Sequence, residues 1–327
     1  MNEENAKIRE VLLECYGVDI AEAKCHFSTQ NYAYIFPNHP YMIRVSKTPK
    51  KTRKEILSEL MWVDDLKQFK QTICEPSISL KGRLLEEFEI DDMTYRASMF
   101  RTARGNVQVT TEMTPMFFIC VGELLGMIHH VSTDEQENGM HFQRSSQQDI
   151  FSRQKEKVWD KLTLELQKKI VEIESKVNEL PKELGNYGLC HGDFHANNFF
   201  VEANNIWLFD FDGCCYSNYL YDVASFMQAC FLGGFGAGKD CRKVIQEEIL
   251  PYFRIGYELN HKCGEDYWEH LQLFFSYRAA FTVLMLSEID TCGVVSSLDE
   301  IKKFFSFILS QDDIYDGITK ALSGRKS

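Results

Sequence analysis

The chain has 327 residues, of which 44% are hydrophobic and 26% are charged, and its formal net charge is −12. This length exceeds what a single hydrophobic core usually holds, which predicts two lobes, while the polar N-terminus and the short apolar stretches predict a cytoplasmic protein with no membrane partner. The excess of acid, most of which follows residue 103, argues against a nucleic-acid partner and mildly favours a cationic or neutral small substrate.

The first hundred residues alternate between helical and strand patterns. Apolar residues at helical spacing predict an opening helix that ends near residue 16, and alternating patterns predict strands at 32–36 and 42–45. A second helix is expected at 52–69. A hairpin with strands at 83–90 and 93–100 then turns at Asp91 and Asp92.

Beyond Gly105 the pattern becomes mainly helical. A helix is expected to end at His129 and His130, and we interpret these residues as helix-end residues rather than metal ligands. A long amphipathic helix, or a pair of helices, is expected over 146–180. Its apolar stripe is most simply a core face, with a coiled-coil partner helix as the alternative.

The most informative segment is residues 191–198, HGDFHANN, which is followed at 208–212 by LFDFD. Asp193 and Asn198 lie five positions apart, and Asp210 ends an apolar run. Phosphoryl transfer needs one carboxylate to orient the attacking hydroxyl, and an amide oxygen and a second carboxylate to hold Mg²⁺. These residue types at these offsets therefore predict a phosphoryl-transfer site.

A β-hairpin is expected between the two parts of this site. Residues 198–201 and 206–209 are short apolar runs, and Asn204 and Asn205 are turn formers between them. Folding the hairpin back would bring Asp210 beside the start of its first strand.

Two other segments have the spacing of a known site. His191 and His195 are four residues apart, but a zinc protease would need a glutamate where Gly192 stands, so zinc is rejected. Residues 233–239 have the spacing of a P-loop, yet Asp240 stands where Mg²⁺ would want serine or threonine. A flexible connection is the better interpretation.

The segments HGDFHANN and LFDFD, together with Asp222 in YLYDVAS, resemble the aminoglycoside phosphotransferase/choline kinase family. Residues 41–47 and 55–63 are similar to that family's third strand and the helix after it. The resemblance implies an α+β, bilobal protein-kinase-like fold. Residues 1–103 would form a small antiparallel-sheet lobe that binds nucleotide, and 104–327 a larger, mostly helical lobe with the catalytic loop and the acceptor site.

The same resemblance implies the roles of individual residues. Asp193 would be catalytic, Asn198 and Asp210 would bind Mg²⁺, and Asp222 would brace the catalytic loop through hydrogen bonds. The cofactor-binding residues would be Arg44, which stands where the family usually presents a lysine, Glu59 as its partner, Asn31 near the phosphates, and Phe100 and Thr102 in the link that meets the adenine.

The sequence thus predicts a phosphotransferase that moves the γ-phosphate of ATP or GTP to a hydroxyl of a small molecule, for which the acidic second half favours a cation. Two alternatives stay open. Arg44 in place of lysine and the glycine-poor loop at 28–31 are compatible with a pseudokinase that binds nucleotide for regulation. A protein Ser/Thr kinase is the other alternative.

Overall fold

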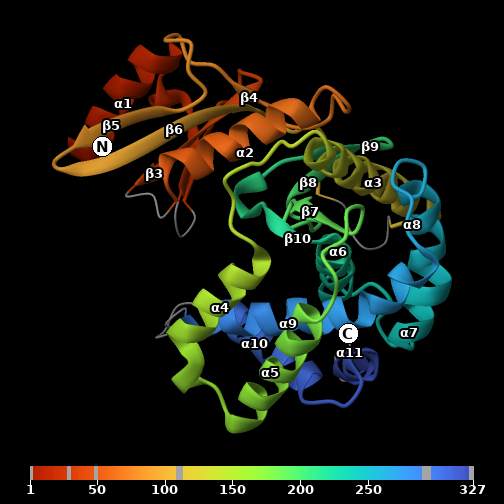
Figure 1. Ribbon diagram of the computed structural model, residues 1–327. Helices are drawn as coiled ribbons and strands as arrows, with labels where there is room; N and C mark the ends of the chain where they lie inside the picture. The colour runs from red at the N-terminus through yellow and green to blue at the C-terminus, as the bar shows by residue number, and fades with distance from the viewer. Residues whose placement is uncertain (1–2, 28–30, 48–50, 108–112, 289–295, 324–327) are drawn as a thin grey trace. The chain divides into compact units, whose positions relative to one another are not determined.

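The computed structural model describes residues 3–27, 31–47, 51–107, 113–288 and 296–323 (Figure 1). The chain forms two compact units. The first consists of Met1–Gly105, Phe142–Arg144 and Trp207–Asp212, and the second of Asn106–His141, Ser145–Ile206 and Gly213–Ser327.

The first unit is built on an antiparallel sheet with the strand order β1-β2-β3-β6-β4. The long strand β6 pairs with β3 along one edge and with β5 and β4 along the other. The strands are β1 (Lys24–Phe27), β2 (Asn31–Ile35), β3 (Tyr41–Lys47), β4 (Pro76–Ser77), β5 (Glu86–Ile90) and β6 (Met93–Arg101).

The predicted hairpin is confirmed as β5 and β6, which turn at Asp91 and Asp92. Both aspartates have a positive φ, 50° and 62°. Aspartate tolerates this left-handed region better than most residues, and two such residues in succession suit the twist of a tight hairpin.

Two helices complete the first unit, in addition to the short turn η1 (Ile20–Glu22). Helix α1 (Glu3–Tyr16) buries Ile8 and Leu12 in one core with Ile43 and Val45 of β3. Helix α2 (Arg53–Leu66) begins at Thr52, which forms a reciprocal capping box with Glu55. Both predicted helices of this half are therefore confirmed.

The second unit is mostly helical (Figure 1). Its helices are α3 (Pro115–Glu137), α4 (Gln147–Val158), η3 (Trp159–Lys161), α5 (Leu164–Asn178), α6 (Leu220–Leu232), α7 (Cys241–Lys243), the π-helical η5 (Val244–Ile249), α8 (Leu250–Tyr257), η6 (Glu265–His270), α9 (Leu271–Glu288), α10 (Ser296–Leu309) and α11 (Ile314–Ser323).

Two small sheets lie in the second half of the chain. Strand β7 (Tyr187–Cys190) pairs antiparallel with β10 (Cys215–Asn218), and β8 (Phe199–Glu202) pairs with β9 (Asn205–Leu208). The short turn η4 (Phe211–Gly213) precedes β10. The expected β8–β9 hairpin is confirmed, but its turn differs. Ala203, not an asparagine, has the positive φ of 55°, and Asn205 already belongs to β9.

Helix α3 is long and apolar enough to cross a membrane, but 67% of its most apolar window is buried inside the protein. It packs closely on α8 because three glycines line the contact. A Cβ at Gly122 would collide with the carbonyl oxygen of Phe253, one at Gly126 with that of Tyr257, and one at Gly256 with that of Ile119. These contacts are those of a core helix.

We expect Gly256→Ala to lower the free energy of unfolding by about 1–3 kcal/mol, because the added methyl group must push two helix backbones apart. Urea unfolding would measure the change. Gly264→Ala is the matched control, since nothing lies within 4 Å of a Cβ at that position. Equal stability of the two variants would contradict the close packing of α3 on α8.

Two further expectations for the second unit are corrected. The predicted long helix over 146–180 is a pair, α4 and α5, because the chain leaves the helix at η3 and restarts at the cap residue Thr163. His129 and His130 lie inside α3, which continues to Glu137. The apolar periodicity fades in the last two turns of α3, although the helix itself does not end.

The P-loop spacing at 233–239 also has a structural explanation. Gly233 is the C-cap of helix α6, whereas a P-loop follows a strand. Gly234, Gly236 and Gly238 have positive φ values of 91°, 71° and 79°. Lys239 forms an exposed ion pair with Glu248. The segment is thus a glycine-rich turn after a helix.

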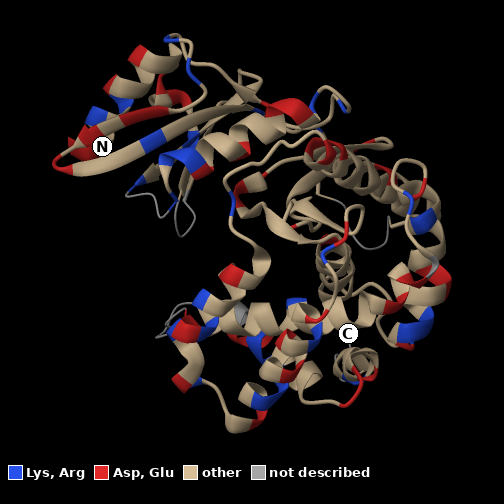
Figure 2. Ribbon diagram, viewed as in Figure 1, with Lys and Arg blue, Asp and Glu red and all other residues tan. Residues whose placement is uncertain are grey.

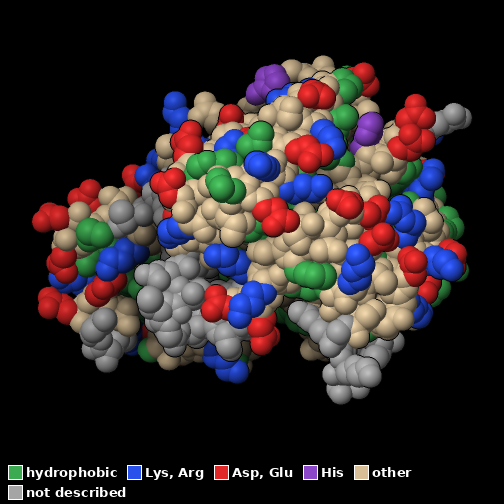
Figure 3. Space-filling model, turned by 90° about the horizontal axis from the view of Figure 1, so that it is seen from below, with side chains coloured by type: hydrophobic (Ala, Val, Ile, Leu, Met, Phe, Trp, Pro, Cys, Tyr) green, Lys and Arg blue, Asp and Glu red, His purple; other side chains and the backbone are tan. Residues whose placement is uncertain are grey.

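Charged residues of both signs are distributed along α4 and α5 (Figure 2). On the face drawn in Figure 3, Lys and Arg side chains alternate with Asp and Glu, and exposed hydrophobic side chains are scattered between them. Within the described part of that face, neither sign of charge forms an extended patch.

Candidate active site

A short loop, residues 191–198, connects β7 to β8. At its start Cys190 lies opposite Cys215 in the β7–β10 ladder. Gly192 has a φ of 82°, and a Cβ there would collide with the carbonyl oxygen of Gly213. Glycine is therefore required at this point, where the backbone turns just before Asp193.

Asp222 braces this loop, as the sequence predicts. It lies in the first turn of α6 and is fully buried. Its Oδ2 accepts a hydrogen bond from the backbone N–H of His191 (2.7 Å), and its Oδ1 accepts one from that of Gly192 (2.8 Å). Hydrogen bonds to a buried carboxylate are strong, so Asp222 fixes the backbone of the loop.

His129 lies next to the carboxylate of Asp222. Its ring is fully buried and stacks on Tyr219 at 4.2 Å between centroids. Its Nδ1 lies 2.6 Å from the Tyr257 hydroxyl and its Nε2 lies 3.5 Å from Oδ2 of Asp222. Burial lowers the pKa of His129 and Asp222 only partly offsets this, so the ring is neutral. His129 thus helps to orient the Asp222 carboxylate without adding a charge.

Cys190 completes a buried group with His129 and Asp222, in which the possible ligand atoms lie within 4.8 Å of one another. The thiol of Cys190 lies 3.6 Å from the carbonyl oxygen of Ser217, and burial raises its pKa well above the usual value. Each of these three residues has a hydrogen-bond partner in the protein. Hydrogen bonding therefore explains why the three side chains lie close together.

His261 lies at the edge of this network and predicts a pH dependence of stability. Its Nε2 lies 2.6 Å from the carbonyl oxygen of Gly185, and burial, which disfavours the charged form of the ring, lowers the pKa of His261 to about 4. The folded state then binds fewer protons than the unfolded state between pH 4 and 6.5. The contribution of His261 to the free energy of unfolding is therefore fully present above pH 6.5 and is lost as the pH falls toward 4.

We expect this single histidine to cost about 2 kcal/mol of stability at pH 5 relative to pH 8. Urea unfolding of the wild type and of His261→Gln at both pH values would measure it, since glutamine can still donate to Gly185 and does not titrate. The same pH dependence in both proteins would contradict the assignment.

Asp193 projects from the loop with its side chain 41% exposed, and each carboxylate oxygen has its own partner. Oδ1 lies 2.5 Å from Nη2 of Arg278, and Oδ2 lies 3.2 Å from Nε2 of His195. Burial alone would raise the pKa of Asp193, but Arg278 and then His195 outweigh it and hold the pKa well below its usual value. The carboxylate is therefore ionised at neutral pH, as an acceptor of a hydroxyl proton must be.

Asn198 closes the loop. Its Nδ2 donates to the backbone carbonyl oxygen of Asp193 (2.9 Å) and lies 3.4 Å from Nε2 of His195. The amide group is buried and its nitrogen faces the loop. The amide oxygen is the atom with which this residue would ligate a hard cation.

Asp210 belongs to the first unit and Asn198 to the second, so their convergence stays a prediction. Asp210 follows the end of β9, where the backbone of Leu208 hydrogen-bonds to Thr72 and Cys74. Its side chain is exposed and its φ is 64°. A non-glycine residue held in this region often marks a functional position.

The first unit contains a buried ion pair on β3 and α2. Nη2 of Arg44 lies 2.8 Å from Oε1 of Glu59, which is fully buried, and the Arg44 guanidinium lies over the Phe100 ring at 4.8 Å. Arg144 approaches the other oxygen of Glu59 at 3.9 Å. Glu59 is therefore shared by two arginines, of which the sequence indicated only Arg44.

Asp212 extends this cluster. Its Oδ1 lies 2.9 Å from Nζ of Lys51 and 3.9 Å from Nη1 of Arg44. Burial would raise the pKa of Asp212, but Lys51 and Arg44 outweigh it and lower the pKa to about 2. Lys51 is thus a cation at this site that the sequence did not single out.

The remaining predicted nucleotide residues lie in the sheet and the link after it. Asn31 is the first residue of β2, and its side-chain oxygen accepts a hydrogen bond from Ser46; residues 28–30 lie outside the described chain. Phe100 is on β6 opposite Met42. The backbone N–H of Thr102 donates to the carbonyl oxygen of Pro40, so this N–H has a protein partner.

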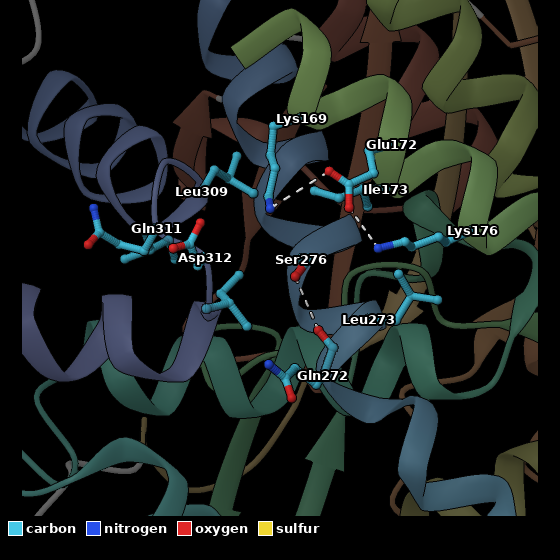
Figure 4. Close-up of a pocket in the computed structure, with 12 residues that line it drawn as sticks. Lys169, Glu172, Ile173, Lys176, Gln272, Leu273, Ser276, Leu309, Gln311 and Asp312 are labelled. Atoms are coloured by element: carbon cyan, nitrogen blue, oxygen red, sulfur yellow. Dashed lines mark hydrogen bonds and ion pairs between the residues drawn. The ribbon is translucent and has the colours of Figure 1, made fainter. Parts of the chain in front are cut away.

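A cavity of about 310 Å³ lies elsewhere in the second unit, between α5, α9, α10 and α11 (Figure 4). Its lining combines the apolar Ile173 and Leu273 with the charged Lys169 and Glu172. No residue of the 191–198 loop lines it. The cavity is therefore separate from the 191–198 loop.

Three comparisons relate the chain to known proteins. The sequence profile of the Phosphotransferase enzyme family matches residues 26–252. Amicoumacin kinase of Bacillus subtilis (strain 168) is 22% identical over 245 residues, which are 74% of this chain and 73% of that protein.

Among solved structures, amicoumacin kinase hAmiN in complex with AMP-PNP, Ca²⁺ and Ami superposes with a TM-score of 0.80 at 16% identity, covering 96% of this chain and 95% of that one. A microcompartment-associated aminopropanol kinase superposes with a TM-score of 0.69 at 18% identity, covering 96% and 95%. These likenesses show that the fold is protein-kinase-like.

Proposed function

Because the chain belongs to the Phosphotransferase enzyme family, we propose that it transfers the γ-phosphate of ATP or GTP to a hydroxyl of a small molecule. The observation that carries the proposal is the loop at 191–198. In this loop Asp193 is ionised, and the amide of Asn198 donates a hydrogen bond to the carbonyl oxygen of Asp193. Asp222 fixes the start of the loop, because it accepts hydrogen bonds from the two backbone N–H groups that directly precede Asp193. Such a rigid pair of oxygen-bearing side chains is what positioning-based catalysis requires.

In this proposal residues 1–103 are the nucleotide-binding lobe, and 104–327 carry the catalytic loop and the acceptor site. Arg44 would contact the nucleotide phosphates, and its ion pair with Glu59 supports the role, because the pair fixes the guanidinium on β3. Asn31 would lie near the phosphates. Phe100 and Thr102 would meet the adenine through the link after β6.

Asn198 and Asp210 would hold Mg²⁺. The donor set fits a hard cation, since one residue offers an amide oxygen and the other an exposed carboxylate. When bound, the ion supplies positive charge that neutralises the β- and γ-phosphates. AMP-PNP and Ca²⁺ in the amicoumacin kinase complex support a nucleotide and a divalent cation here.

Asp193 would accept the hydrogen bond of the acceptor hydroxyl and take its proton as the reaction proceeds. The hydroxyl oxygen then bonds to the γ-phosphorus while the bond to the β,γ-bridging oxygen breaks, and the nucleoside diphosphate leaves. The carboxylate is ionised in the free protein, so it is ready for this role.

The acceptor that we propose is a small hydroxyl compound that also carries an amine. The names of an aminopropanol kinase and of amicoumacin kinases among the similar proteins support a small-molecule acceptor, and the net charge of −12 favours a cation. A cytoplasmic enzyme without nucleic-acid or membrane partners fits such a substrate.

The test is a screen of the purified protein with MgATP and MgGTP against amino alcohols, aminoglycosides, amicoumacin and neutral sugars. We expect nucleoside diphosphate and a singly phosphorylated amine-bearing product, detected by mass spectrometry. A product formed only on added proteins, or none despite nucleotide binding, would contradict the proposal and favour a protein kinase or a pseudokinase.

A further inference from the structure

Arg278 contacts the 191–198 loop although it lies far from that loop in the sequence. It lies within α9, and its side chain is only 15% exposed. Nη2 donates to Oδ1 of Asp193 (2.5 Å), and Nη1 donates to the Tyr221 hydroxyl (2.8 Å) and approaches the carbonyl oxygen of Gly192 (3.3 Å). The guanidinium therefore joins α9, α6 and the loop.

The orientation of Arg278 is itself fixed. Its guanidinium lies over the Tyr221 ring at 5.4 Å and over the Phe281 ring at 6.0 Å. The Tyr221 hydroxyl also accepts a hydrogen bond from Nε2 of Gln147 on α4 (2.9 Å). A planar cation held between aromatic rings and a hydroxyl has little freedom, so it can impose one orientation on its carboxylate partner.

The two oxygens of Asp193 are held differently. Oδ1 meets Arg278, a permanent cation that is mostly buried. Oδ2 meets His195, whose contact is longer, at 3.2 Å, and whose charge depends on protonation. Oδ2 is therefore the oxygen whose protein partner is more easily replaced by a ligand hydroxyl.

We propose that Arg278 is a positioning residue that fixes Asp193 through Oδ1, so that Oδ2 is presented to the acceptor hydroxyl. This inference rests on the proposed function, because it assigns Asp193 to the acceptor. Arg278 touches neither nucleotide nor metal in this account. Its loss should therefore slow the transfer step and leave nucleotide affinity nearly unchanged.

The experiment compares Arg278→Met, Arg278→Lys and the wild type. For Arg278→Met we expect kcat to fall about 10- to 100-fold, with KM for the nucleotide within about 2-fold, since only the geometry of the carboxylate is lost. Arg278→Lys should recover part of kcat because the charge remains. Arg254→Met is the matched control. Arg254 also pairs with a carboxylate, that of Glu258, and lies over an aromatic ring, that of Trp268, but its ion-pair partner is outside the 191–198 loop.

A double-mutant cycle with Asp193→Asn separates the possible failures. If the inference holds, Arg278→Met lowers kcat by less than about 3-fold in the Asp193→Asn background. Equal losses in both backgrounds, or a change confined to KM for nucleotide, would overturn it. Full activity of Asp193→Asn itself would instead overturn the proposed function.

Should Arg278→Met fail to fold, restoration of kcat in Arg278→Ala by added guanidinium chloride at millimolar concentration supports the inference, and no restoration overturns it.

Discussion

Asp193→Asn is expected to lower kcat about 10²- to 10⁴-fold while nucleotide still binds with nearly unchanged affinity. The amide keeps the size of the side chain but cannot take a proton, and it removes the negative charge opposite Arg278. Because Asp193 is proposed to contact the acceptor and not the nucleotide, the loss should fall on the transfer step. Initial rates and nucleotide titration by calorimetry would measure the two effects separately.

The control for this variant is Asp160→Asn, which makes the same change at an exposed position in η3. We expect it to behave as the wild type. Unchanged turnover of Asp193→Asn would remove Asp193 from the mechanism, whereas loss of nucleotide binding in parallel with kcat would show that the substitution disrupts the whole site.

Asp222→Asn is expected to lower both stability and activity. Asp222 accepts hydrogen bonds from two backbone N–H groups with its two oxygens. An amide can offer only one oxygen, so one buried N–H would face another donor. We expect the free energy of unfolding to fall by about 2–3 kcal/mol and kcat to fall at least 10-fold, because the loop that carries Asp193 loses its brace.

Asp316→Asn is the matched control, since Asp316 also lies in the first turn of a helix but is exposed. Urea unfolding and initial rates measure the two outcomes. An Asp222→Asn protein that matches the wild type in both would contradict the bracing role. If stability falls but kcat of the folded fraction is unchanged, Asp222 stabilises the fold and does not contribute to activity.

The sequence predicted those parts of the fold and of the site that local patterns encode. The turn at Asp91 and Asp92 and the hairpin of β8 and β9 follow from short-range apolar alternation and turn formers. Asp222 was assigned its bracing role through the family resemblance. Each of these features depends on residues that are close in the chain or belong to a motif of fixed spacing.

The residues that the sequence missed act over long separations. Arg278 is 85 positions from Asp193, and His129 is 93 positions from Asp222. An arginine in an apolar helix and a histidine beside a second histidine have no periodicity that reveals a partner. A polar residue within an otherwise buried helical stripe was the available signal for both, since such a residue must find a hydrogen-bond partner.

Two other features do not follow from the local sequence pattern. Ala203 takes the left-handed position in the β8–β9 turn although two asparagines follow it. The glycines of α3 and α8 read as helix-weakening residues, but they allow two backbones to meet. The close approach of the two helices cannot be obtained without the tertiary contacts that the glycines allow.

The most direct test of the account is a crystal structure of the protein with AMP-PNP, Mg²⁺ and an unreactive acceptor analogue. We predict that the amide oxygen of Asn198 and a carboxylate oxygen of Asp210 lie about 2.0–2.1 Å from the ion, and that Oδ2 of Asp193 lies within hydrogen-bond distance of the acceptor. A metal bound to other residues, or a nucleotide bound away from these three side chains, would contradict it.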